Sequence, residues 1–224
     1  MWAVTVAWDG WYRDRGGEER VSIRNDGHQL TVTIRGIEFT GSHLDDLEAA
    51  TDLPDETAFT IDHGALCACE LVWTIPIAVV ADGAVVDGQL GCHLILGAPP
   101  RRAAGDTVSV LLEFGGSTYT AHASGWFEVA LEALHRQVPR GTYTRTCIAC
   151  AWSDYQPGGS PLFGGLACFR DAKDAYRRIT TKHDMFEILP ALTEWVQETH
   201  VCDQFERREA GVGYRGSFPA DLGE

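Results

Sequence analysis

The chain has 224 residues, with 18 Lys or Arg against 32 Asp or Glu, so its formal net charge at neutral pH is −14. This balance argues against direct binding to the phosphate backbone of nucleic acids, which requires a basic face. No basic segment followed by a long apolar run opens the chain, and no apolar stretch approaches the roughly 18 residues that span a bilayer. We therefore expect a cytoplasmic protein whose cysteines are thiols or metal ligands rather than disulfides.

The first 125 or so residues show the alternation of half-buried strands. Leu30, Val32 and Ile34 share one face of the segment HQLTVTIRG, and Asp26-Gly27 before it is a two-residue hairpin turn signal. The segment TVSVLLEF alternates in the same way and is followed by Gly115-Gly116, a second hairpin signal. Together with CACELVWTIPI and GQLGCHLILG, these segments predict an antiparallel sheet folded into a sandwich or half-barrel.

Acidic residues are concentrated within this strand region, because no Lys or Arg occurs between Arg35 and Arg101. The acidic residues of that stretch are Glu38, Asp45, Asp46, Glu48, Asp52, Asp55, Glu56, Asp62, Glu70, Asp82 and Asp87. One interpretation is a solvated surface that aids solubility. The other is a negative face that steers a basic partner, since complementary fields mainly raise the association rate.

The spacing of apolar residues changes to that of a helix near Trp126. The predicted buried stripe of this helix is Trp126, Val129, Ala130, Ala133 and Leu134. FRDAKDAYRRI also predicts a helix, and Thr181 with Asp184 resembles a capping box that opens KHDMFEIL. Pro190 predicts the start of one more helix. Its buried side would hold Leu192, Trp195, Val196 and Thr199.

These patterns predict an α+β protein in three parts. Residues 1–140 form an antiparallel β-rich region that ends in one helix, 141–210 form a cysteine-containing helical region stabilised by zinc, and 211–224 form a flexible tail. The change near residue 140 is one of architecture rather than of linker composition, so a single composite domain is an equal alternative.

Three of the seven cysteines follow the strand alternation. Cys67 and Cys69 are in phase with the apolar residues of CACELVWTIPI, and Cys92 is in phase with those of GQLGCHLILG. Core packing is the favoured interpretation, because free cysteine behaves as a small buried hydrophobe. His93 points away from Cys92 in this phase, so the two do not form a pair.

The other four cysteines have the spacing of a metal site. Cys147 and Cys150 form a C-x2-C knuckle, and Cys168 and Cys202 follow after 17 and 33 residues. A tight C-x2-C turn brings two thiolates to one zinc ion at about 2.3 Å each. We expect one structural zinc on Cys147, Cys150, Cys168 and Cys202, with His200 and His183 as substitutes for one thiol. A redox C-x-x-C and inert thiols remain alternatives.

The segment CIACAWSDYQPGGSPLFGGLACFR, followed by VQETHVCDQFERREAGVGYRG, resembles a family of uncharacterised bacterial proteins. The pattern that carries the resemblance is C-x-x-C-x-x-S-D-Y-x-P…F-G-x-L-x-C-F-R, with a later E-T-x-x-C-x-x-F-E-x-R. It covers most of the last third of the chain and supports grouping Cys147, Cys150, Cys168 and Cys202. It implies no particular activity.

The sequence lacks G-x-S-x-G, H-E-x-x-H and the P-loop, and its G-x-G-x-x-G match at Gly211, Gly213 and Gly216 has no room for the βαβ unit that such a motif needs. We expect a binding protein, immunity-like or inhibitory, that masks a basic effector protein through its acidic half. An enzyme with Asp154, Tyr155 and Arg170 beside the knuckle is one alternative, although structural roles for these residues are favoured. A subunit of a larger assembly, anchored by exposed Trp8, Trp11 and Trp152, is another.

Overall fold

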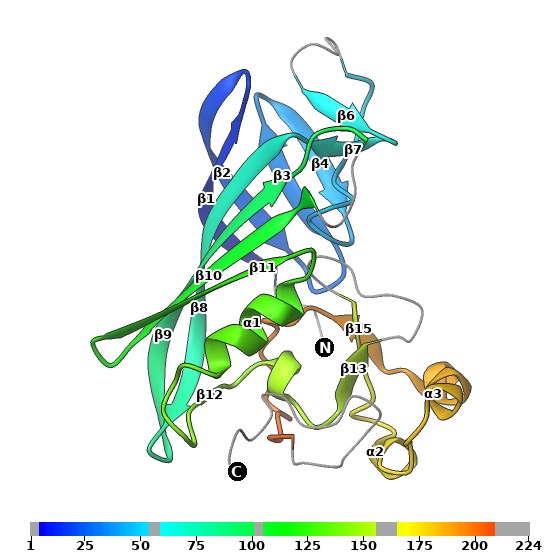
Figure 1. Cartoon of the computed structure of the whole chain (residues 1–224). Helices are drawn as coiled ribbons and strands as arrows, with labels where there is room; N and C mark the ends of the chain where they lie inside the picture. The colour runs from blue at the N-terminus through cyan, green and yellow to red at the C-terminus, as the bar shows by residue number, and fades with distance from the viewer. Residues whose placement is uncertain (1–4, 54–58, 101–104, 156–164, 209–224) are drawn as a thin grey trace.

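One large antiparallel sheet forms most of the protein (Figure 1). The computed structural model describes residues 5–53, 59–100, 105–155 and 165–208. The sheet has 12 strands, in the order β11-β10-β9-β8-β1-β2-β3-β4-β5-β7-β6, with β12 paired to β8. The strands are β1 (Val6–Asp14), β2 (Gly17–Asn25), β3 (Leu30–Ile34), β4 (Ile37–Gly41), β5 (Glu48–Ala49), β6 (Thr60–Asp62), β7 (Ala65–Cys67), β8 (Cys69–Ala81), β9 (Ala84–Leu96), β10 (Thr107–Phe114), β11 (Ser117–Ser124) and β12 (Tyr143–Thr144).

Alternation of side chains builds the core on one face of this sheet. Leu30, Val32 and Ile34 are buried as expected, and so are Cys67, Cys69 and Cys92. The predicted core role of the three cysteines is therefore confirmed. The Gly115-Gly116 turn is confirmed as well, because both residues have positive φ, as hairpin turns of this length require. The β2–β3 connection is longer than the predicted two residues and runs from Asp26 to Gln29.

Helix α1 (Phe127–His135) packs against β10 and β11. Its buried side is Phe127, Ala130, Leu131, Leu134 and His135. Trp126 and Val129 are each 44% exposed, so the predicted stripe was shifted around the helix. The shift arises because Trp126 precedes the helix in an extended conformation and does not belong to the first helical turn.

The region after α1 carries a second, three-stranded sheet in the order β13-β14-β15. Its strands are β13 (Ser153–Tyr155), β14 (Leu166–Cys168) and β15 (Glu194–Val196). The helical elements of this region are short: the 3-10 turns η2 (Cys147–Ala149) and η3 (Leu189–Ala191), and the helices α2 (Lys173–Tyr176) and α3 (Lys182–Ile188). The capping box of Thr181 and Asp184 is present at the start of α3, as predicted.

The predicted α+β class, with a helical C-terminal region, is wrong: the protein is mostly antiparallel β. The expected helix after Pro190 is replaced by β15, in which Val196 lies opposite Leu166 of β14. Strand pairing therefore outweighed a helical pattern that had only three apolar residues and one threonine. The two regions share one core, since Cys147, Tyr155, Leu166 and Val196 join the cluster formed by the large sheet. The predicted tail, 211–224, lies outside the described residues. Within the described part of the chain, no helix is long and apolar enough to cross a membrane.

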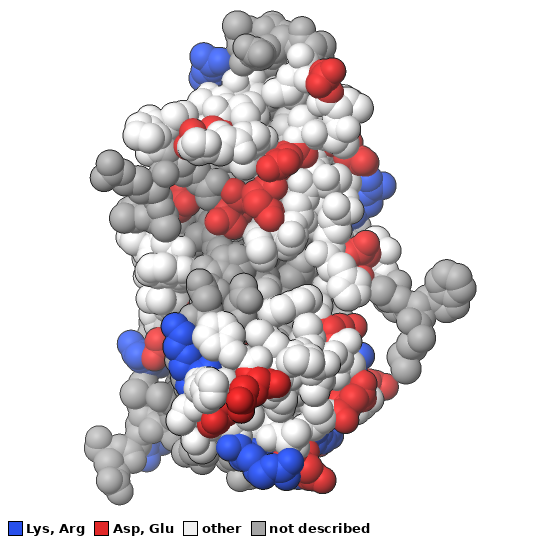
Figure 2. Space-filling model, turned by 90° about the vertical axis from the view of Figure 1, so that its right-hand side faces the viewer, with Lys and Arg blue, Asp and Glu red and all other residues white. Residues whose placement is uncertain are grey.

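The acidic residues of the Arg35–Arg101 stretch are divided between two parts of the sheet. Glu48 and Asp52 are exposed at the β4–β7 end, whereas Asp82 and Asp87 are exposed on the β8–β9 hairpin. Figure 2 shows a group of acidic side chains in the upper half of one face, with Lys and Arg mixed among acidic side chains in the lower half. The negative charge is therefore a local feature of this face.

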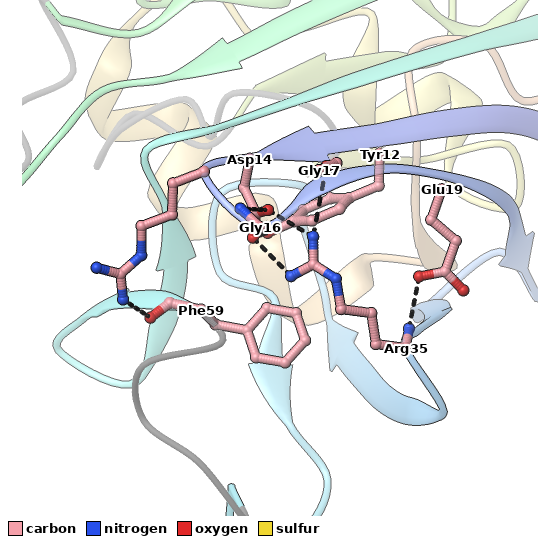
Figure 3. A network of polar contacts seen from close by, with 8 residues as sticks. Tyr12, Asp14, Gly16, Gly17, Glu19, Arg35 and Phe59 are labelled. Atoms are coloured by element: carbon pink, nitrogen blue, oxygen red, sulfur yellow. Dashed lines mark hydrogen bonds and ion pairs between the residues drawn. The ribbon is translucent and has the colours of Figure 1, made fainter.

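A polar network fixes the end of the β1–β2 hairpin (Figure 3). The side chain of Asp14 is 1% exposed and accepts hydrogen bonds from both terminal nitrogens of Arg35, at 2.9 and 2.5 Å. Tyr12 Oη and the Gly16 N–H also donate to Asp14, at 2.9 and 2.7 Å. Burial alone would raise the pKa of Asp14, but these hydrogen bonds outweigh it and hold the pKa below its ordinary value.

Replacing Asp14 by Asn is expected to lower the free energy of unfolding by about 2 kcal/mol at neutral pH, because Arg35 loses its ionic partner. A carboxylate with a lowered pKa stabilises the fold above its unfolded pKa, about 3.9, and this contribution is lost as the pH falls through the folded value. Urea unfolding of wild type and Asp14→Asn should therefore show a difference in the free energy of unfolding that is largest at neutral pH and disappears in acid. Glu18→Gln is the control, because the Arg13–Glu18 pair is exposed to solvent and its loss should change the free energy of unfolding little. A difference that stays constant with pH would contradict a stabilising role of the ionised Asp14 carboxylate.

Candidate functional site

The C-x2-C knuckle is a single 3-10 turn, η2, that begins at Cys147. The Cys150 N–H donates to the Cys147 carbonyl at 3.0 Å, which closes the turn and keeps the two residues together. Ser153 Oγ donates to the same carbonyl. Both thiols are buried, with 3% and 5% of Cys147 and Cys150 exposed.

The segment from Glu198 to Arg208 wraps around the knuckle through backbone hydrogen bonds. Cys147 N–H donates to His200 O at 2.9 Å, and Ile148 N–H donates to Glu198 O at 3.0 Å. Further along, Ala151 N–H donates to Glu206 O at 2.8 Å, and Arg208 N–H donates to Ala149 O at 3.0 Å. Cys202 lies between these two sets of contacts and is thereby held at the knuckle.

Cys168 reaches the same place from the small sheet. It ends β14, where its register partners are Ser153 of β13 and Glu194 of β15. The Phe169 N–H donates to Trp152 O at 2.7 Å, which links the end of β14 to the second residue after the knuckle. The structure therefore brings all four predicted residues, Cys147, Cys150, Cys168 and Cys202, to one locality.

Electrostatic interactions join the four thiols. Burial raises the pKa of Cys147, and the thiols of Cys150, Cys168 and Cys202 raise it further. Burial also raises the pKa of Cys168 and of Cys202. All four cysteines are free thiols. Among the described residues, no group of three or more His, Cys, Asp or Glu side chains is arranged closely enough to hold a metal ion. The four sulfurs are thus neighbours without forming a closed coordination sphere.

The two histidines considered as substitutes differ in their placement. His183 lies on α3, where its side chain is 79% exposed and pairs with Glu187 at 3.3 Å. His200 is partly buried beside the knuckle, and burial lowers its pKa. Of the two, His200 is the one that contacts the cysteine segment, through the carbonyl that accepts from Cys147 N–H.

The residues of the enzyme alternative are occupied by neighbouring side chains. Tyr155 Oη donates to Glu198 Oε1 at 2.7 Å, and Asp154 Oδ2 accepts from Tyr176 Oη at 2.8 Å. Arg170 forms an ion pair with Glu194. Asp154 and Tyr155 are also buried. These contacts assign the three side chains to support of the small sheet rather than to an open reactive site.

Arg208 is a central residue of this region that the sequence analysis missed. It is 3% exposed, and its guanidinium donates to the Cys150 carbonyl at 3.1 Å, to Tyr176 Oη at 3.0 Å and to the Ser153 carbonyl. Its position among charged and glycine residues near the chain end resembles a solvated tail, so no local signal marks it as buried.

The three tryptophans considered as anchors are placed differently from one another. Trp8 and Trp152 are buried, with 4% and 2% exposed, so the expectation that they are exposed anchors is wrong. Trp11 is 43% exposed, and its register partner on β8 is Val72, which is 40% exposed.

The molecule is therefore an antiparallel β-sheet protein with a cysteine-bearing segment packed against its core. Residues 6–153 match DUF6304, described as a family of unknown function, and the chain belongs to this family. The match includes Cys147 and Cys150 and ends before Cys168 and Cys202, so it does not extend over the motif that carried the predicted resemblance. Neither a curated protein nor a solved structure matches the chain.

Proposed function

We propose that this chain is an acidic cytoplasmic binding protein, immunity-like or inhibitory, whose partner is a protein with a basic surface. The observation that carries the proposal is the stretch between Arg35 and Arg101, which holds acidic residues and no Lys or Arg. A face of one sign attracts an oppositely charged partner and speeds the encounter.

Several acidic residues of the stretch already have partners within the chain. Glu38 pairs with Arg24 at 2.8 Å, Asp46 with His43 at 3.2 Å, and Glu70 with His93 at 3.1 Å. Asp55 and Glu56 lie outside the described residues. Glu48 and Asp52 are exposed near the β4–β7 end of the sheet, which favours this end as the surface that meets the partner.

The experiment is a charge reversal with a matched control. Glu48→Lys/Asp52→Lys changes the charge of the proposed surface, and Glu113→Lys/Asp171→Lys makes the same change at exposed positions outside the acidic stretch. Partners are captured from an extract of the native host at low salt, and association rates are then measured with the purified partner. We expect the first variant to associate about tenfold more slowly than wild type at low ionic strength, and the control to match wild type. Equal rates for both variants, or no basic protein among those captured, would contradict the proposal.

We further propose that Cys147, Cys150, Cys168 and Cys202 hold one structural zinc ion, as the C-x-x-C motif and its resemblance suggest. Support comes from the convergence of four free thiols around the knuckle. Adjacent thiols resist ionisation together, and a divalent cation relieves that repulsion by binding them as thiolates. Zinc with four thiolates has no position open to water, so it would stabilise the C-terminal segment rather than catalyse a reaction.

A further inference from the structure

The large sheet ends in two unlike edge strands, β6 and β11 (Figure 1). An edge strand presents unpaired N–H and C=O groups, so proteins commonly shorten it, charge it, interrupt it with a bulge or place proline in it. β6 is three residues long and ends in Asp62. β11 is eight residues long, pairs with β10 in one continuous register, and contains no Pro, Lys, Arg, Asp or Glu in its sequence STYTAHAS. The β11 edge therefore lacks the protection that the β6 edge has.

The backbone groups that β11 turns away from β10 belong to alternate residues. Ser117 pairs with Phe114 and closes the two-residue turn, so its N–H and C=O point toward β10. The Thr120 carbonyl points the other way, since it accepts from Gln137 Nε2, just after α1, at 2.7 Å. The exposed residues with outward backbone groups are thus Thr118, Thr120, His122 and Ser124.

The edge strand and its flanks carry no charge. From Gly115 to Phe127 there is no Asp, Glu, Lys or Arg, so a partner with a basic surface is not attracted here. A second copy of this chain, with a formal net charge of −14, meets the least repulsion at such a surface. Trp126, two residues after β11, is 44% exposed, and aromatic side chains of this kind often anchor interfaces.

We propose that β11 pairs antiparallel with β11 of a second copy, so that two large sheets become one across a two-fold axis. Two-fold dimers are the commonest homo-oligomers, and two identical edge strands that pair antiparallel have this symmetry. An axis at Ala121 brings all the outward groups together: Thr120 exchanges two hydrogen bonds with His122 of the second copy, and Thr118 does so with Ser124 of that copy. This interface is independent of the basic partner and of zinc.

The test measures the oligomeric state of the full chain by sedimentation velocity, over a range of concentrations at low and high salt. Thr120→Pro removes an outward N–H and leaves the hydrogen bonds to β10 in place, which is why edge strands tolerate proline. Thr120→Ala is its matched control, because alanine keeps that N–H.

A second variant, His122→Glu, keeps every backbone group. It adds a carboxylate to each copy, and the proposed register makes these two carboxylates diagonal neighbours on one face of the joined sheet. His183→Glu makes the same change on α3, where the side chain is 79% exposed, and is the matched control.

We expect wild type and both controls to form a dimer whose affinity rises with salt, because salt screens the repulsion between two acidic copies. Thr120→Pro should weaken the dimer at least about tenfold, since each copy loses one hydrogen bond across the axis. His122→Glu should weaken it about tenfold at low salt and less at high salt. Circular dichroism shows which variants are folded, and His122→Glu keeps the test decisive if Thr120→Pro is not. A wild type that stays monomeric at every concentration, or unchanged dimerisation of either folded variant at low salt, would overturn the proposal.

Discussion

Purified protein is expected to contain one zinc ion per chain, and Cys147→Ser is expected to abolish it. Cys147 is the most buried of the four thiols and interacts with the other three, so its loss removes the centre of the set. A structural zinc site contributes about 10 kcal/mol of apparent binding free energy, which is large compared with the stability of a small segment. Cys202→Ser should weaken zinc binding less, since Cys202 is partly exposed.

Elemental mass spectrometry measures the metal content. Hydrogen exchange measures whether the metal protects the backbone amides of the knuckle. The amides of Cys147 and Ile148, which donate to His200 and Glu198, should lose protection when zinc is removed by a chelator. Cys92→Ala is the control: it deletes a thiol from the core of the large sheet and should leave the zinc content unchanged. Metal-free wild type, or full zinc in Cys147→Ser, would refute the site and return the knuckle to the redox or inert-thiol alternatives.

Replacing Arg208 by Met is expected to lower the free energy of unfolding by about 3 kcal/mol. The guanidinium is buried and donates to two carbonyls and to Tyr176 Oη, and methionine removes these three hydrogen bonds. Arg208→Lys should restore little of the lost stability, because an ammonium group does not reproduce the planar arrangement of donors in a guanidinium.

The neighbouring residue provides the matched control for Arg208. Arg207 is partly exposed and stacks on Tyr143, with 4.0 Å from Cζ to the ring centroid, so Arg207→Met should cost only about 1 kcal/mol. The free energies of unfolding of wild type, Arg208→Met, Arg208→Lys and Arg207→Met are compared by chemical denaturation in the same buffer. Equal stability of Arg207→Met and Arg208→Met would show that the guanidinium of Arg208 is not a structural link.

The large sheet could be predicted from sequence because its signals are local. The alternation of Leu30, Val32 and Ile34 and the Gly115-Gly116 turn depend on neighbours in the chain, and so does the capping box at Thr181. The Pro190 segment failed because Trp195 and Val196 suit a strand as well as a helix, and pairing with β14 made the choice.

The candidate site also has features that the sequence predicts and features that it does not. The grouping of four cysteines follows from their spacing, and the structure brings them together. The contacts of Arg208 and the pairing of Asn25 with Gln197 join segments far apart in sequence, so no local pattern predicts them. Burial of a lone arginine near the chain end is a tertiary property.

The hydrogen bond between Asn25 and Gln197 joins residues 172 positions apart, and Leu166 and Val196 contribute to the same core as the large sheet. The order of synthesis therefore matters. A nascent chain can form the β1–β2 and β8–β9 hairpins early, but it cannot cover the underside of the sheet until its last third has been translated. Closing contacts of such long sequence separation slows folding. Residues 6–153, which match the family, therefore share their hydrophobic core with residues that lie outside the match.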